Sequence, residues 1–307
     1  MLPVLLKGQG MDISFRRWRI GEVTITRMVE FGPVELAPDA LFPAASAELV
    51  KSIGWLRPDF ASEGGEIRMN FQCFLIHTPD RKILVDTCVG EQKHLAHEGL
   101  SGLMTGFLDT LAKAGAGPDD IDVVLCTHLH WDHVGWNTRL VDGVWRPTFP
   151  NARYLFARDE LAFALGHELE PGDASVAESI QPVLAAGLAD LVDMDHRLCD
   201  EVRLEPTPGH TPGHVSVWIE SNGARAMISG DAIHHPLQFA KPDIASGYCC
   251  APRQGCETRR QLFGRLAGEP VLFIGTHFAE PTAGLVARDG DAWRLDAVWD
   301  ESLPEPH

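Results

Sequence analysis

The chain has 307 residues, of which 45% are hydrophobic and 22% charged, and this ordinary composition supplies enough apolar mass for a folded core. Its formal net charge of −17 gives an acidic surface that repels phosphate backbones and anionic lipid headgroups. We therefore expect no nucleic-acid partner and no membrane association. Seven cysteines, an odd number without a CxxC pair, fit a reducing, cytoplasmic location.

The N-terminal part of the chain is predicted to be an arm over residues 1–65. Its first residues, Met1 to Lys7, are apolar but lack a basic segment in front, so we expect no signal peptide. Residues 21–31 alternate as a strand does, and the Pro-rich, apolar stretch 36–60 predicts an irregular segment with short helices. Such an arm packs on its own core or on a second subunit. Residues 66–307 are expected to form the main domain, within one globular unit overall.

The main domain begins with a predicted hairpin of strands 69–77 and 82–86, joined by a turn of Thr, Pro, Asp and Arg. The remaining elements, in chain order, are expected as a helix at 103–114, strands at 123–126 and 152–156, a helix at 158–165, a helical lid at 174–191, a strand at 202–204, a hairpin of 215–220 and 225–229, a helix at 258–266, a strand at 271–275 and a hairpin of 284–288 and 292–295. Because each half of the chain has strands followed by a helix, we predict an α/β fold with two sheets back to back and helices outside. That fold class is a four-layer αβ/βα sandwich.

Residues 128–133 read His-Leu-His-Trp-Asp-His and directly follow the apolar strand 123–126. Imidazole and carboxylate are the ligands that zinc prefers where sulfur is absent. His128 and His130, two residues apart, can share a metal ion. Asp132 and His133 then lie on the other side of the turn, where a second ion could bind.

Three later strand ends supply further ligand candidates, at positions where loops of layered α/β folds carry function. The segment 207–214 reads Thr-Pro-Gly-His-Thr-Pro-Gly-His and is rigid, with His210 the better ligand and His214 a supporting residue. Asp231 follows a strand and a glycine and can bridge two metals, and His277 ends another strand. Each of these alone is weak, because turns and isolated strand-end histidines are more often structural.

Taken in order, these motifs resemble the metallo-β-lactamase superfamily of dinuclear metallohydrolases, over about residues 70–277. The resemblance implies the metallo-β-lactamase fold with the metals at one edge. The implied ligands are His128, His130 and His210 for the first metal, Asp132, His133 and His277 for the second, and Asp231 as the bridge. Asp86 matches a position that orients the motif loop, the alternative being an ordinary turn carboxylate.

The resemblance also implies the chemistry. Two Zn²⁺ ions per chain are the expected cofactors, with Mn²⁺, Co²⁺ or Fe as alternatives, and a bridging hydroxide would attack the substrate carbonyl. Asp132 is expected to steer that hydroxide or to pass its proton to the leaving group. Redox di-iron members of the superfamily carry Glu where this chain has His130, which favours hydrolysis here.

Three segments narrow the resemblance further. Residues 131–137, 149–152 and 230–236 are similar to the group that holds N-acyl homoserine lactone lactonases and methyl parathion hydrolase, whose long N-terminal arms build homodimers. Many of those lactonases have Tyr three residues after the bridging Asp, where this chain has His234. His234 is therefore expected either to donate a proton in catalysis or to be hydrogen-bonded to a ligand. The resemblance predicts a homodimeric, quorum-quenching lactonase.

Aromatic side chains near the motifs predict a hydrophobic substrate pocket, although each is individually more often a core residue. They are Trp131, Trp136, Phe239 and Phe278. An apolar pocket beside two metals suits a neutral lactone, ester or phosphotriester as the small-molecule substrate. The alternatives are an organophosphate triesterase or arylesterase, and a metal-binding sensor domain without turnover, against which the intact ligand set argues.

Overall fold

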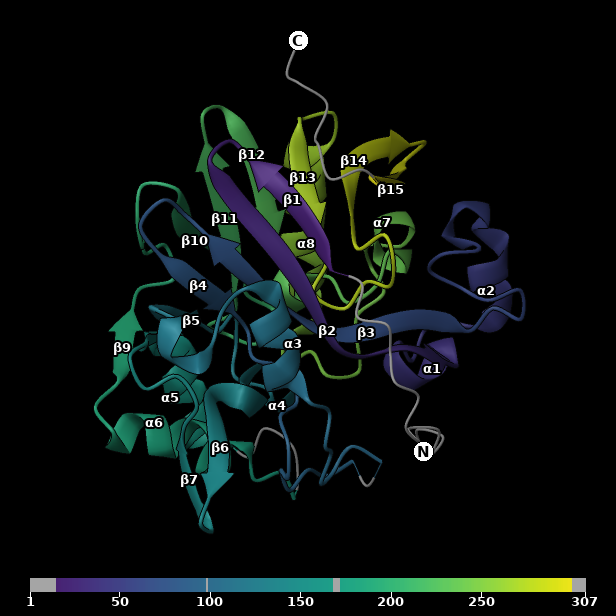
Figure 1. Cartoon of the computed structure of the whole chain (residues 1–307). Helices are drawn as coiled ribbons and strands as arrows, with labels where there is room; N and C mark the ends of the chain where they lie inside the picture. Colours follow the sequence, from purple (N-terminus) through teal and green to yellow (C-terminus); the bar gives the residue numbers. More distant parts are fainter. Residues whose placement is uncertain (1–14, 98, 168–171, 300–307) are drawn as a thin grey trace. The chain divides into compact units, whose positions relative to one another are not determined.

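The computed structural model describes residues 15–97, 99–167 and 172–299 (Figure 1). The start of the predicted arm, including Met1 to Lys7, lies outside the described residues. The chain divides into two compact units. Within the described ranges, unit 1 comprises residues 15–17, 24–31 and 71–192, and unit 2 comprises residues 18–23, 32–70 and 193–299.

A seven-stranded sheet has the spatial order β1-β2-β3-β4-β5-β8-β9, and its first three strands contain residues of both units. Its strands are β1 (Arg16–Ile20), β2 (Val23–Leu36), β3 (Ile67–His77), β4 (Lys82–Val85), β5 (Val123–Leu125), β8 (Arg153–Ala157) and β9 (Ala189–Val192). The pairs β4–β5, β5–β8 and β8–β9 are parallel, whereas β3 and β4 form the predicted antiparallel hairpin. Continuous apolar runs such as β5 are typical of parallel strands that are covered on both faces.

Short helices and a small hairpin complete unit 1. They are α3 (Phe107–Ala114), η2 (Pro118–Asp120), α4 (Trp131–Val134), η3 (Gly135–Asn137), β6 (Thr138–Val141), β7 (Val144–Pro147), α5 (Arg158–Gly166), η4 (Val176–Ile180) and α6 (Gln181–Ala185). The core of unit 1 joins strand residues such as Leu75 and Val124 to Phe107 and Leu111 of α3.

Two helix predictions in unit 1 were wrong in extent. Helix α3 begins only after Gly106, whose φ of 70° is left-handed and incompatible with a helix that starts at residue 103. The predicted helical lid at 174–191 is helical only over the π-helical η4 and the directly following α6, and Gly187, at φ 69°, lies between α6 and strand β9. Ile180 and Val183 of this segment are buried in the core of unit 1, so it packs on that core.

Unit 2 contains a six-stranded sheet with the order β10-β11-β12-β13-β14-β15. Its elements are β10 (Val202–Pro206), β11 (Val215–Ser221), β12 (Ala224–Ile228), η5 (Gly230–Ala232), α7 (Leu237–Ala240), α8 (Pro252–Leu266), β13 (Val271–Ile274), β14 (Ala283–Asp289) and β15 (Ala292–Ala297). Strands β12 and β13 are parallel and connected through α8, and the other neighbours are antiparallel (Figure 1). Asn222 and Gly223 both have positive φ, as a tight two-residue hairpin turn requires.

The described part of the arm contains α1 (Pro38–Leu41), α2 (Ala47–Ser52) and η1 (Gly54–Leu56), the short helices that its composition predicts. Phe42 and Phe60 of this segment are buried in one hydrophobic cluster with Phe239 and Leu262. The arm thus supplies part of the core of its own unit, and the homodimer stays a prediction.

Both sheets with their helices confirm the α/β fold class that the sequence predicts. Within the described ranges, no helix has the length and apolarity that a bilayer crossing demands. All seven cysteines are free thiols, and Cys73, Cys88 and Cys126 are buried as expected.

Candidate metal centre

The His-Leu-His-Trp-Asp-His segment begins directly after β5 and turns into the one-turn helix α4. The extended backbone of His130 ends the loop, and the N–H of His133 donates to the His130 carbonyl over 3.0 Å. Gly135 follows because a Cβ there would lie 1.9 Å from the Val89 carbonyl oxygen. The glycine therefore lets the loop after β4 pack directly against the motif.

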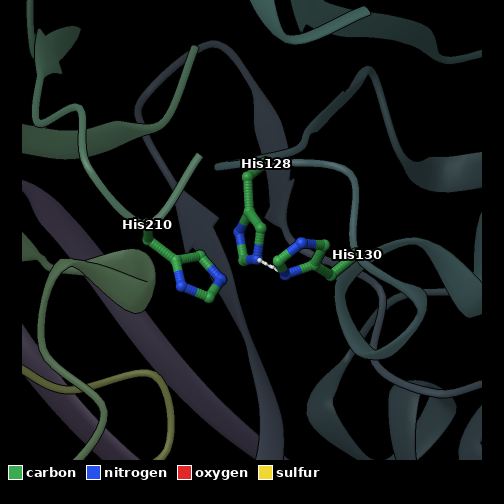
Figure 2. Close-up of side chains that lie close together, drawn as sticks. All are labelled: His128, His130 and His210. Carbon is green, nitrogen blue, oxygen red and sulfur yellow. Dashed lines mark hydrogen bonds between the residues drawn. The ribbon is translucent and has the colours of Figure 1, made fainter. Parts of the chain in front are cut away.

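The first two histidines of the motif face each other. His128 Nε2 lies 3.1 Å from His130 Nδ1, and Figure 2 shows this contact as a dashed line between the two rings. The His128 ring centroid is also 4.1 Å from that of His133. His128 and His133 are both fully buried, so their rings have almost no contact with bulk water.

Asp86, at the end of β4, holds the motif loop in place. Its Oδ1 accepts from the Thr127 N–H over 2.7 Å, and its Oδ2 accepts from Thr127 Oγ1 over 2.9 Å. Oδ2 also lies 2.9 Å from His133 Nδ1, and the other ring nitrogen, Nε2, lies 3.7 Å from Asp132 Oδ1. A φ of 58° aims this fully buried carboxylate at the loop, a conformation that Asp tolerates better than most residues.

Two buried glutamates support the same loop, and sequence reasoning did not find either. Glu30 on β2 accepts from the Val89 N–H and from Trp136 Nε1, each over 2.7 Å, and burial raises the pKa of its carboxyl to about 7. Glu160 on α5 accepts from the Leu129 N–H over 3.0 Å. An isolated Glu in an apolar strand or an amphipathic helix gives no sequence signal of such a role.

Unit 2 places a second set of predicted ligands around Asp231. Asp231 Oδ2 lies 3.5 Å from His210 Nε2, and Asp231 Oδ1 lies 3.2 Å from His277 Nε2. The two oxygens of one carboxylate therefore face two different histidines. His210, Asp231 and His234 each offer a ligand atom within 4.8 Å of the others, and all three are buried.

His214 fixes the backbone of Asp231 and is not aimed as a ligand. Its Nε2 accepts the Asp231 N–H over 2.8 Å, and its Nδ1 lies 2.9 Å from Thr207 Oγ1. Thr207 Oγ1 is also hydrogen-bonded to Ser216 Oγ over 2.9 Å, and Ser216 Oγ donates to the Ser229 carbonyl over 2.8 Å. Since Nε2 accepts a hydrogen bond, the neutral ring carries its proton on Nδ1.

The backbone and one thiol orient the other two histidines of this set. His277 Nδ1 lies 2.9 Å from the Asn70 carbonyl oxygen, and His210 Nδ1 lies 3.7 Å from the Cys249 sulfur. Gly209 has a φ of 134° and packs against the backbone of Gly255. A Cβ at position 209 would lie 2.3 Å from the Gly255 nitrogen. The loop that carries His210 is thus closely packed on α8.

His234, the residue predicted at the position of a catalytic Tyr, lies beside the same carboxylate. Its Nε2 is 3.2 Å from Asp231 Oδ2, and its ring centroid is 4.7 Å from that of His210. Gln238 accepts from the His234 N–H over 2.8 Å and anchors this segment. Both expected roles, proton donation and contact with a ligand, are compatible with this placement.

The predicted substrate pocket divides into one partly exposed residue and three core residues. Trp131 is half-buried, next to Phe71 at a centroid distance of 5.8 Å. Trp136, Phe239 and Phe278 are buried in hydrophobic clusters, Trp136 in unit 1 and the two phenylalanines in unit 2. They are large apolar residues inside strongly apolar packing, so burial in the core accounts for them.

Asp132 has a side chain that is 12% exposed, and its Oδ1 lies 3.7 Å from His133 Nε2. In both units the donors are imidazole nitrogens and carboxylate oxygens with little access to solvent. Imidazole nitrogens and carboxylate oxygens that converge in a buried site are the donors that a divalent cation accepts. The chemistry of both sets therefore fits a divalent metal such as Zn²⁺.

Comparison with known proteins agrees with this reading. A family model described as the metallo-beta-lactamase superfamily matches residues 72–288. The N-acyl homoserine lactonase AiiA of Bacillus thuringiensis subsp. kurstaki is 30% identical over 218 residues, which cover 66% of this chain and 79% of the relative. A probable metallo-hydrolase, YybB of Bacillus subtilis (strain 168), is 26% identical over 146 residues, covering 45% of this chain and 60% of the relative.

Two solved structures share the fold. AidC, a dizinc quorum-quenching lactonase in complex with a product, superposes with a TM-score of 0.77 at 22% identity, covering 93% of this chain and 98% of that one. The hydrolase AbOPH superposes with a TM-score of 0.76 at 23% identity, covering 94% and 98%.

The chain belongs to the metallo-β-lactamase superfamily. It has the α/β fold of that superfamily and is a metal-dependent hydrolase, as its relatives are. The predictions of fold, family and enzyme class are confirmed, and the alternative of a sensor domain without turnover is set aside.

Proposed function

We propose that this protein is a dinuclear zinc hydrolase that opens the ring of lactones, with N-acyl homoserine lactones as the substrate class and quorum quenching as the role. The observation that carries the proposal is the Asp231 carboxylate, whose Oδ2 faces His210 and whose Oδ1 faces His277. A carboxylate with this arrangement is suited to bridge two metal ions. The relatives named as lactonases support the choice of substrate class.

In this proposal seven side chains hold two zinc ions. The first ion is bound by His128, His130 and His210, the second by Asp132, His133 and His277, and Asp231 bridges them. Asp86 and His214 bind no metal in this scheme, because the first is occupied by Thr127 and His133 and the second by the Asp231 N–H. Mn²⁺, Co²⁺ and Fe are the alternative metals.

The bound ions would supply a nucleophile at neutral pH and would polarise the lactone carbonyl. The chain's own residues then orient the groups and move the proton. Asp132, partly exposed beside His133, would accept a proton at a carboxylate oxygen. His234 would donate from Nε2 to the ring oxygen that leaves, the task of Tyr in the resembling lactonases.

The charge of the protein favours a substrate without a net charge. A formal charge of −17 disfavours the approach of anionic substrates. Trp131 is the one residue of the predicted pocket that is half-buried rather than part of the core, and we propose it as an apolar contact for an acyl chain. Organophosphate triesterase or arylesterase activity is the second candidate function. We also propose that the protein is a homodimer located in the cytoplasm.

The test uses the full chain, purified and loaded with Zn²⁺. Metal content is measured together with kcat/KM for N-acyl homoserine lactones, simple lactones, an aryl ester and a paraoxon-type triester. The matched variants are Asp231→Asn in the metal set and Asp243→Asn, whose carboxylate pairs with Arg260 on the surface. We expect about two metals per chain, highest kcat/KM for the homoserine lactones, loss of metal and activity in Asp231→Asn, and no change in Asp243→Asn.

The other outcomes each revise the proposal. A preference for the triester or the aryl ester would select the second candidate. Two bound metals with no turnover of any of these substrates would reject the substrate class. A wild-type metal content in Asp231→Asn would reject the bridging ligand itself.

A further inference from the structure

Cys249 is the thiol that the ring of His210 contacts. Its sulfur lies 3.7 Å from His210 Nδ1, within the range of a hydrogen bond to sulfur. The backbone holds the two residues together, because the Cys250 N–H donates to the His210 carbonyl over 2.9 Å and the Ala251 N–H donates to the Gly209 carbonyl over 3.0 Å. Two backbone hydrogen bonds next to this contact therefore join the loop carrying His210 to the segment before α8.

The contact bears on which nitrogen of His210 carries the proton. A neutral imidazole carries one N–H, and the hydrogen bond made by one nitrogen sets the role of the other. If Nδ1 carries the proton and donates to the Cys249 sulfur, the lone pair of Nε2 is available on the side where Asp231 Oδ2 lies, 3.5 Å away. His133 and His277 are oriented in the same way, through Nδ1, by Asp86 and by the Asn70 carbonyl.

We propose that Cys249 is a positioning residue for metal binding, whose sulfur accepts the hydrogen bond from His210 Nδ1 and holds the ring with Nε2 toward the metal. The inference rests on the proposed function, in which His210 is a ligand. Cys249 binds no metal itself in this scheme and acts only through His210. Cys249 lies outside every sequence motif that points to the metal ligands, so the sequence alone gives it no role in metal affinity.

The test compares Cys249→Ala, which removes the acceptor, with Cys249→Ser, which replaces it by a hydroxyl. Cys250→Ala is the matched control, because the side chain of Cys250 is exposed. Zn²⁺ affinity is measured by competition with a chromogenic chelator, the ligand field by the visible spectrum of the Co²⁺-substituted protein, and folding by urea denaturation of the metal-free protein. We expect Cys249→Ala to weaken the binding of one metal by about 10- to 100-fold and to alter the Co²⁺ spectrum. Cys249→Ser and Cys250→Ala should bind as the wild type does.

A fourth variant, His210→Ala, separates failure of this inference from failure of the proposed function. If His210→Ala loses one metal but Cys249→Ala binds two with wild-type affinity, the positioning role is refuted and the ligand assignment stands. Equal weakening in Cys249→Ser and Cys249→Ala would also refute it, since the hydroxyl would then not replace the acceptor. If His210→Ala itself retains both metals, His210 is not a ligand and the proposed function fails at that residue.

Discussion

His133 Nδ1 lies 2.9 Å from Asp86 Oδ2, and neither side chain has any exposed surface. The same carboxylate accepts two hydrogen bonds from Thr127, directly before the first histidine of the motif. Asp86 therefore connects the start and the end of the His-Leu-His-Trp-Asp-His segment. Because a carboxylate only accepts, all three of its neighbours must donate, and this fixes the proton of His133 on Nδ1.

The first prediction concerns Asp86→Asn. The asparagine amide has only one acceptor oxygen. Its NH₂ group would therefore face a donor whose hydrogen bond the Asp86 carboxylate accepts in the wild type. We expect a loss of about 1–3 kcal/mol in the free energy of unfolding and a decrease of about 10- to 100-fold in metal affinity. Urea unfolding of the metal-free protein and chelator competition measure the two effects. Wild-type metal affinity would show that Asp86 supports only the fold.

The second prediction concerns Asp132→Asn. If Asp132 receives or passes a proton, the amide should lower kcat by about 10²-fold or more while the protein keeps most of its metal. The measurement pairs turnover with metal analysis on one preparation. Its comparison is His133→Ala, which should lose metal and turnover together. An unchanged kcat in Asp132→Asn would exclude proton transfer by this residue.

The residues that we propose as ligands stand out in the sequence, whereas most of the residues that orient their side chains do not. The motif at 128–133 is dense, and strand ends predict where His210, Asp231 and His277 meet. The supports of these side chains are buried glutamates, a thiol and backbone carbonyls. A carbonyl such as that of Asn70 leaves no trace in the sequence, because every residue has one.

The third prediction distinguishes core from substrate contact. Phe239 stacks on Phe263 at a centroid distance of 4.3 Å inside unit 2, so Phe239→Leu should lower the free energy of unfolding by about 1 kcal/mol and leave KM unchanged. Trp131→Leu should raise KM for long-chain lactones more than for short-chain ones. Steady-state kinetics over a series of acyl lengths, with urea unfolding, checks both. The same KM in Trp131→Leu at every chain length would remove Trp131 from the substrate site.

The fourth prediction is a pH dependence of stability that originates at Glu30. Its pKa is raised from 4.5 to about 7 by burial, so the folded protein retains a proton that the unfolded chain releases. This contribution is fully present below pH 4.5 and is lost as the pH rises through about 7. The free energy of unfolding should therefore fall by about 3 kcal/mol over this window.

Glu30→Gln provides the control, because glutamine does not titrate. Its unfolding free energy should be lower at low pH, since one amide N–H faces a donor such as the Val89 N–H. The decrease between pH 5 and pH 8 should be smaller than in the wild type. Parallel slopes in the two proteins would assign the pH dependence to other groups.

Elements with a clear hydrophobic periodicity could be predicted from the sequence. The predicted bounds were wrong where a single glycine limits a helix. Strands and hairpins of unit 2 lie where alternation and Asn-Gly chemistry predict them. The helix expected from residue 103 and the one expected over 174–191 were shortened at Gly106 and Gly187, which both adopt left-handed backbone. Strands β6 and β7 were missed because two strands of four residues each are too short to show a distinct alternation.

The segment 207–214 contains the tetrapeptide Thr-Pro-Gly-His twice, with opposite outcomes. The first copy ends in His210, which presents a nitrogen to the Asp231 carboxylate, and the second ends in His214, which accepts from the Asp231 backbone. The same tetrapeptide thus has two roles, because His214 directly precedes β11 whereas His210 lies in the middle of the loop. A graft of this loop onto another protein must therefore include residues 229–231, because hydrogen bonds join the loop to Asp231 directly and to Ser229 through Ser216.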